Sequence, residues 1–215
     1  MESSLYVSEL AGLVKLGKVN IELIDDAVRR ILRVKYELGL FDDPYKYCNM
    51  DRSNSELASD ENMKVALEAA KKSIVLLKNN NQLLPLEKQG EKIAIIGPLA
   101  NDKNSPLGNW RSQAVYNSAS SVLEGMKNYN QNKLVFEKGV DLYYGKTNFH
   151  NRVKLNFDDR TGFDKAKLAA ENSDIVIMVL GEEGNQSGEG RSRTNIGLPG
   201  LQLELLKEIY KINQN

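Results

Sequence analysis

The chain has 215 residues, enough for one large domain or parts of two. Lysine plus arginine and aspartate plus glutamate number 29 each, so no net field favours nucleic acid or an anionic membrane as a partner. No stretch approaches the roughly 20 apolar residues of a membrane span, and the N-terminus MESSLYVSEL lacks the basic start and apolar core of a signal peptide.

Two residue types that build metal sites and catalytic triads are scarce. Cys48 is the single cysteine, which rules out an internal disulfide framework, and His150 is the single histidine. His150 stands in the polar stretch KTNFHNR with no partner at metal-ligand spacing. We therefore expect a solvated loop histidine, no metal site, no Ser-His-Asp triad and no cofactor.

The first part of the chain has the apolar spacing of helices. Helices are predicted over 4–17 and 21–39, with Asn20 as the cap of the second. Gly17 and Gly39 are suited to end them, because glycine accepts the left-handed conformation that commonly follows a helix.

The next stretch is less regular. Residues 48–60 are polar and have the composition of a linker. A third helix is predicted over 61–79, although its end, SIVLLKN, is also compatible with a strand because β-branched residues crowd it.

From Lys92 onward, candidate strands alternate with candidate helices, which indicates an α/β domain. The runs KIAIIG, KLVFEKG and DIVIMVLG are the three strand candidates, and the first and third are typical of strands buried in a parallel sheet. Helices are expected to begin at Ser121, which with Glu124 has the capping-box spacing, then at Phe163, and then near Pro199 as the first helical residue. A sheet of three strands is a thin core, so we expect the front portion of something longer.

A long loop, 181–198, follows the third candidate strand and reads GEEGNQSGEGRSR at its start. Ligands of open α/β sheets bind beyond the carboxyl ends of the strands, where this loop belongs. The Walker pattern and G-x-G-x-x-G are absent and the carboxylates would repel phosphate, so a nucleotide-binding protein is disfavoured.

Proton transfer is the chemistry that uses carboxylates on such a loop, and Glu182, Glu183 and Glu189 are the candidates. Glu182 and Glu183 abut the strand and could simply cap it. Glu189 lies in the middle of the loop, flanked by glycines and close to two arginines. A solvated surface loop is the competing interpretation.

Four segments carry a family resemblance, in order and at the expected approximate spacing. They are GKVNIELIDDAVRRILRVKYELGLFDDPY, AAKKSIVLLKNNNQLLPL, KIAIIGPLAND and SGEGRSRTNIGLPGLQLELL. Over almost its whole length the chain resembles the β-glucosidase and β-xylosidase group of glycoside hydrolase family 3.

The resemblance implies an architecture in which a (β/α)8-type barrel is followed by a linker and an α/β sandwich domain, with the active site between the two domains. Residues 1–47 would be the last helices of an incomplete barrel. Residues 48–90 would be the interdomain linker with its helix, and 91–215 the first part of a truncated α/β sandwich.

The resemblance also implies a retaining mechanism, in which a barrel aspartate attacks the sugar and a glutamate of the second domain is general acid and then base. Glu189 in SGEGRSR matches that glutamate, and the two carboxyl groups of retaining enzymes lie about 5–5.5 Å apart. Arg193 would order the loop or lie near the sugar. The implied substrates are β-linked oligosaccharides or glycosides, either glucosides or xylosides.

The family's nucleophile stands in an SDW-type motif, and this chain has no such sequence. The implied partner is therefore the missing barrel segment of the same enzyme, and we expect the chain alone to be inactive. The alternative is a non-catalytic carbohydrate-binding or interaction remnant of the sandwich domain. Export stays open, since a full-length parent could be periplasmic or secreted.

Overall fold

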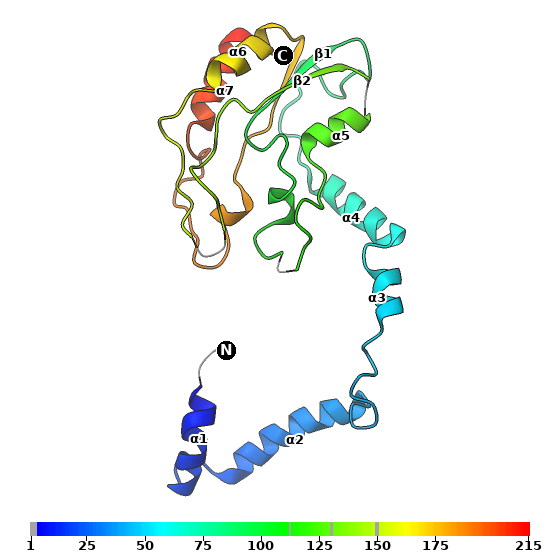
Figure 1. Ribbon diagram of the computed structural model, residues 1–215, viewed down its shortest axis with the longest axis vertical. Helices are drawn as coiled ribbons and strands as arrows, with labels where there is room; N and C mark the ends of the chain where they lie inside the picture. The colour runs from blue at the N-terminus through cyan, green and yellow to red at the C-terminus, as the bar shows by residue number, and fades with distance from the viewer. Residues whose placement is uncertain (1–3, 112, 130, 149–150) are drawn as a thin grey trace. The chain divides into compact units, whose positions relative to one another are not determined.

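The computed structural model describes residues 4–111, 113–129, 131–148 and 151–215, and Figure 1 shows the order of their helices and strands. The chain divides into two compact units, Met1–Leu77 and Lys78–Asn215. We refer to them as the N-terminal unit and the C-terminal unit. Within the described part of the chain, no helix has both the length and the apolar character needed to cross a membrane.

The N-terminal unit consists of helices. They are α1 (Leu5–Lys15), α2 (Ile21–Glu37), α3 (Met50–Glu56) and α4 (Asp60–Ser73). The predicted cap of α2 is confirmed, because the Asn20 side chain accepts a hydrogen bond from the Glu22 N–H at 3.0 Å. The predicted stops are confirmed too: Gly17 and Gly39 follow the helices with φ angles of 69° and 72°.

One helix of this unit was missed and the end of another was wrong. α3 lies in the stretch of linker composition, where no helix was predicted, and Asn49 caps it by accepting from the Arg52 N–H at 2.8 Å. α4 ends at Ser73 rather than near residue 79, because Ile74 turns to an extended conformation. Residues 74–79 belong to no helix and no strand, so this stretch forms neither of the two predicted structures.

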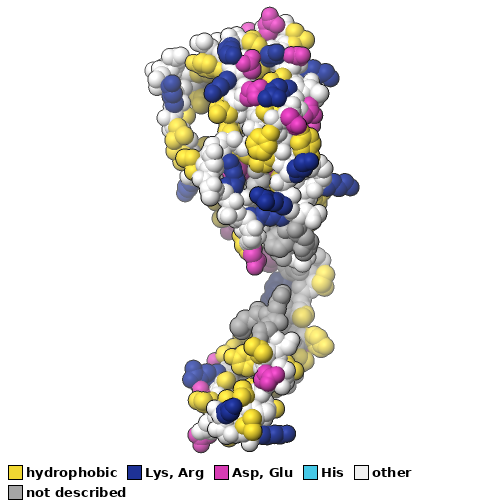
Figure 2. Space-filling model, turned by 90° about the vertical axis from the view of Figure 1, so that its left-hand side faces the viewer, with side chains coloured by type: hydrophobic (Ala, Val, Ile, Leu, Met, Phe, Trp, Pro, Cys, Tyr) yellow, Lys and Arg dark blue, Asp and Glu magenta, His cyan; other side chains and the backbone are white. Residues whose placement is uncertain are grey.

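None of the described residues in these four helices is buried within the chain. On α2, for example, Leu23 is 68% exposed and Ile31 is 61% exposed. Figure 2 shows hydrophobic side chains at the surface of this part of the chain, among charged ones. The apolar faces that the sequence pattern predicts are therefore present but uncovered.

The C-terminal unit is built on a parallel sheet, as predicted. Its strands are β1 (Lys92–Ile96), β2 (Lys133–Glu137) and β3 (Ile175–Met178), in the order β2-β1-β3. Ile93 of the central strand pairs with Leu134 on one side and with Ile175 on the other. All of Ile93 to Ile96 is fully buried, which confirms that KIAIIG is a strand covered on both faces.

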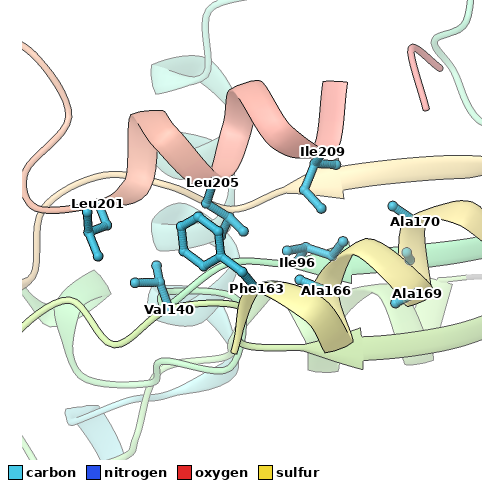
Figure 3. Packing of buried hydrophobic residues seen from close by; sticks show 10 residues of the cluster. Ile96, Val140, Phe163, Ala166, Ala169, Ala170, Leu201, Leu205 and Ile209 are labelled. Atoms are coloured by element: carbon cyan, nitrogen blue, oxygen red, sulfur yellow. The ribbon is translucent and has the colours of Figure 1, made fainter. Parts of the chain in front are cut away.

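Side chains of β1 alternate between two hydrophobic clusters. Ala94 and Ile96 face α6 (Phe163–Glu171) and α7 (Gln202–Ile212), where Leu205 and Ile209 of α7 point toward the sheet (Figure 3). Ile93 and Ile95 pack on the opposite face with Leu123 of α5 (Val122–Tyr129). The sheet is thus covered by helices on both faces, which defines an α/β architecture.

The three helix starts predicted in this unit have different outcomes, and α6 begins at Phe163 as predicted. The capping box of α5 is confirmed: the Glu124 N–H donates to Ser121 Oγ and the Ser121 N–H donates to Glu124 Oε2, each at 3.1 Å. Pro199 was wrongly predicted as the first residue of the last helix, because α7 begins at Gln202. Gly200 has a φ angle of 63°, which is incompatible with a right-handed helix and delays its start.

Candidate active site

The carboxyl ends of the three strands lie at one edge of the sheet, and the loops that leave them form the candidate site. α5 follows β1 and covers one face, whereas α6 follows β2 and covers the other. Connections that leave toward opposite faces open a crevice at the strand ends, where α/β proteins bind ligands. The loop after β3, which carries the predicted site residues, starts at this crevice.

Arg193 cross-links the loop after β3. Its guanidinium forms an ion pair with Glu182 and donates to the Gly197 carbonyl oxygen at 2.8 Å. The Arg193 side chain is only 23% exposed, so this pair is partly shielded from solvent. These contacts tie the beginning of the loop to its end, while a contact of Arg193 with a sugar stays a prediction.

Arg191 connects the same loop to the loop that follows β2. Its guanidinium donates to the Asn185 carbonyl oxygen at 2.9 Å and to the Asn148 carbonyl oxygen at 3.0 Å. The arginines that stand beside Glu189 in the sequence therefore have defined structural partners. They shape the surroundings of Glu189 instead of projecting freely into solvent.

Glu189 is an exposed residue at the tip of the loop, in a turn between two glycines. It lines a hollow of about 590 Å³ together with Arg191 and Arg193, and with residues 152, 153 and 155 from the segment that precedes α6. Among the described residues that line this hollow, Glu189 is the sole acid. The hollow thus offers a single carboxyl group that is accessible for proton transfer.

Glu183 has a different environment from Glu189. It is 6% exposed and begins a short 3-10 helix, Gly184–Gln186, through a reciprocal capping box with Gln186. Its Oε2 atom accepts from Asn185 Nδ2 at 3.2 Å, whereas no described residue donates to its Oε1 atom. Glu183 is therefore fixed by local structure and buried away from the Glu189 hollow.

A second, larger pocket of about 720 Å³ lies beside Glu183. Its wall combines aromatic side chains, including Tyr116 and Tyr144, with amides such as Asn104 and Asn185. Tyr144 donates its hydroxyl hydrogen to Asp158, and this hydrogen bond raises the pKa of Tyr144. Aromatic faces beside polar amides suit a small molecule with both apolar and hydroxyl-bearing surfaces.

The three candidate glutamates differ in their contacts. Glu182 is held in the ion pair with Arg193 and Glu183 caps the 3-10 helix, whereas Glu189 is free to meet a ligand in its hollow. His150 lies outside the described residues. Within the described part of the chain, no three His, Cys, Asp or Glu side chains gather as a possible metal site.

Sequence reasoning missed the contribution of the segment before α6. Leu155 forms an isolated antiparallel bridge with Tyr143, and Arg152, Val153 and Leu155 reach the Glu189 hollow. The fully buried Asn156 holds this segment, because its Nδ2 donates to the carbonyl oxygens of Asp141 and Asp159 at 2.9 and 3.0 Å. The sequence signal for this segment was Asn156 itself, in the stretch NFDDR, because asparagine is a residue type that favours turns.

The C-terminal unit is therefore an α/β sandwich-type domain whose strand ends carry an exposed glutamate on an ordered loop. Residues 74–215 match the model of the glycosyl hydrolase family 3 C-terminal domain. The chain belongs to glycoside hydrolase family 3, which confirms the resemblance read from the sequence.

Relatives with described activities are β-glucosidases and β-xylosidases. The chain is 37% identical to a periplasmic β-glucosidase of Salmonella typhimurium, over 96% of this chain and 28% of that protein. It is also 37% identical to a β-xylosidase of Formosa agariphila, over 89% of this chain and 25% of that protein. The chain thus spans about a quarter of the length of these relatives.

Solved structures agree with this assignment. The chain superposes on a β-glucosidase from Listeria innocua in complex with gluconolactone with a TM-score of 0.81 and 33% identity, covering 99% of this chain and 27% of that chain. The family is one of glycosidases, and the C-terminal unit lies within the region that matches its C-terminal domain.

Proposed function

We propose that this chain supplies the acid/base half of a retaining β-glycosidase that removes terminal glucose or xylose units. Glu189 protonates the leaving glycosidic oxygen and then deprotonates the attacking water. The observation that carries the proposal is the placement of Glu189, an accessible carboxyl group in a hollow at the carboxyl edge of the sheet. The names of the relatives support the substrate class.

The nucleophile belongs to a barrel segment that this chain does not contain. Double displacement needs two carboxylates, and Glu189 is the sole acid among the described residues of its hollow. The uncovered apolar faces of the N-terminal unit support the proposal that residues 1–47 complete such a barrel, with 48–90 as linker and 91–215 as sandwich. Alone, the chain has no meaningful glycosidase activity.

The test replaces the matching quarter of the Salmonella typhimurium β-glucosidase with this chain and compares the chimaera with the chain alone. We expect hydrolysis of aryl β-glucosides or β-xylosides by the chimaera only. Glu189→Gln should lower kcat by about 10²–10⁴-fold for a poor leaving group and by much less for an activated one. Glu171→Gln, an exposed glutamate at the end of α6, is the matched control.

Two results would contradict the proposal. A Glu189→Gln chimaera that is as active as its parent on a poor leaving group would remove the acid role. Turnover by the chain alone that disappears on Glu189→Gln would show that the chain needs no barrel partner.

A second candidate function is carbohydrate binding without catalysis, and the 720 Å³ pocket beside Glu183 favours it. Titration of the chain alone with xylobiose and cellobiose, followed by NMR, tests it. Saturable shifts that are lost in Tyr116→Ala would support a binding remnant, since Tyr116 lines the pocket and is 72% exposed. Unchanged spectra would leave the acid/base proposal as the sole function.

A further inference from the structure

Gln202, at the start of α7, is a polar side chain that is fully buried. Its Oε1 atom accepts from the Gly181 N–H at 2.9 Å. Its Nε2 atom donates to the carbonyl oxygens of Gly181 at 2.8 Å and of Pro199 at 2.9 Å. The amide therefore bonds to main-chain groups on both sides of the loop that carries Glu189.

The partners of the Gln202 side chain lie at the two ends of the loop that carries Glu189. Gly181 is the first residue of the loop after β3, and Pro199 lies at its end, just before α7. One side chain thus closes the base of the loop. Buried amides matched to buried backbone groups are costly to break, because removal of one partner leaves the other without a hydrogen bond.

The helix that carries Gln202 is itself immobilised by the core. Leu201, Leu205 and Ile209 of the same segment are 6%, 0% and 1% exposed, and they pack against the sheet (Figure 3). We call the hydrogen bonds of Gln202 to Gly181 and Pro199 the Gln202 clamp. Because α7 is packed on the sheet, the Gln202 clamp restricts motion at the base of the loop. The second cross-link, between Arg193 and Glu182, is partly exposed and correspondingly weaker.

We infer that Gln202 is a positioning residue for Glu189: it fixes the base of the acid/base loop so that the carboxyl group is held where the leaving oxygen will be. This inference rests on the proposed function of Glu189. Its physical basis is that misplacement of a reacting group by about 1 Å can lower the rate by about 10²-fold.

Hydrogen exchange of the complete 215-residue chain is the first part of the test. Gln202→Met keeps the volume of the side chain but removes all three hydrogen bonds. We expect the Gly181 amide to exchange at least about 10-fold faster, while the buried amides of β1 change only with global stability. The control is Ile209→Val, which perturbs the same helix without touching the loop. If the Gly181 amide of Gln202→Met exchanges at the wild-type rate after correction for global stability, the Gln202 side chain does not hold the base of the loop.

Kinetics of the chimaera with the Salmonella typhimurium enzyme are the second part. Gln202→Met should lower kcat by about 10–100-fold on a poor leaving group with KM changed by less than about threefold, and by little on an activated leaving group. A structural defect alone would lower both rates equally, and that pattern would overturn the positioning role.

The two proposals fail in distinguishable ways. An active Glu189→Gln chimaera removes the acid/base assignment, whatever Gln202→Met does. A Gln202→Met chimaera with wild-type kcat on a poor leaving group, beside an impaired Glu189→Gln chimaera, removes the positioning role alone.

Discussion

Leu205 offers a quantitative test of the packing that supports the candidate site. This side chain is 0% exposed and lies in the cluster that joins α7 to the sheet and α6. Leu203, two residues earlier on the same helix, is 46% exposed. Truncation of each to alanine removes the same atoms from one helix, so burial is what separates the two variants.

The magnitude follows from what surrounds Leu205. Buried Leu→Ala substitutions cost about 2–5 kcal/mol, with the larger values where the cavity cannot collapse. Leu205 lies against Ala166 and against the backbone of Gly139, where an added Cβ would stand 2.7 Å from Leu205 Cδ2. These small neighbours cannot extend into the space, so we expect a loss of about 3–4 kcal/mol in the free energy of unfolding. For Leu203→Ala we expect less than about 1 kcal/mol.

Urea unfolding followed by far-ultraviolet circular dichroism measures both values, and thermal unfolding should show a decrease on the order of 10 °C for Leu205→Ala. The exposed Trp110 is a poor reporter of core packing, so fluorescence is not suitable. If the two variants lose similar free energy with unchanged m-values, the assignment of Leu205 to the core of the C-terminal unit is wrong.

Two further predictions concern the loop ends and the helix contacts. Gly200→Ala should cost more than about 2 kcal/mol, because a Cβ there would meet the Asn156 carbonyl oxygen at 2.7 Å in addition to left-handed strain of about 1–2 kcal/mol. Gly190→Ala, with a similar φ of 67° and nothing within 4 Å, should show the strain alone, and equal losses in urea unfolding would refute the crowding at Gly200. The two-pronged hydrogen bonds from Arg160, at 2.6 and 2.7 Å, lower the pKa of Glu204. This stabilisation is complete above the ordinary glutamate pKa of about 4.3 and is lost as the pH falls through the lowered folded-state pKa. Glu204→Gln should therefore reduce the fall in unfolding free energy at acid pH. An unchanged fall would contradict the lowered pKa of Glu204.

The sheet could be predicted from the sequence because its strands carry their own signal. Ile93–Ile96 form a continuous apolar run, and such a run fits a strand covered on both faces. α3 could not be predicted, since its residues MDRSNSE have no apolar periodicity and none of them is buried. The late start of α7 depends on the positive φ angle of Gly200, which the helical spacing of the apolar residues does not specify.

The candidate site, like the fold, could be predicted from the sequence only in part. The position of Glu189 after the third strand follows from chain order, which the sequence contains. The partners of Glu182, Arg191 and Arg193 depend on how loops from different strands meet, and no local pattern specifies these contacts. The sequence therefore singled out Glu189 by its place in the loop, whereas the partners of Glu182 and Glu183 became known only from the structure.

The strand order β2-β1-β3 also has a consequence for biosynthesis. The central strand leaves the ribosome first, and its partner Ile175 follows Ile93 by 175 − 93 = 82 residues. At translation rates of about 5–20 residues per second, KIAII waits roughly 4–16 s with one edge unpaired. Glu91 precedes this strand, Lys92 begins it and Pro98 follows it, and charged residues and proline in such positions disfavour aggregation of a transiently exposed strand.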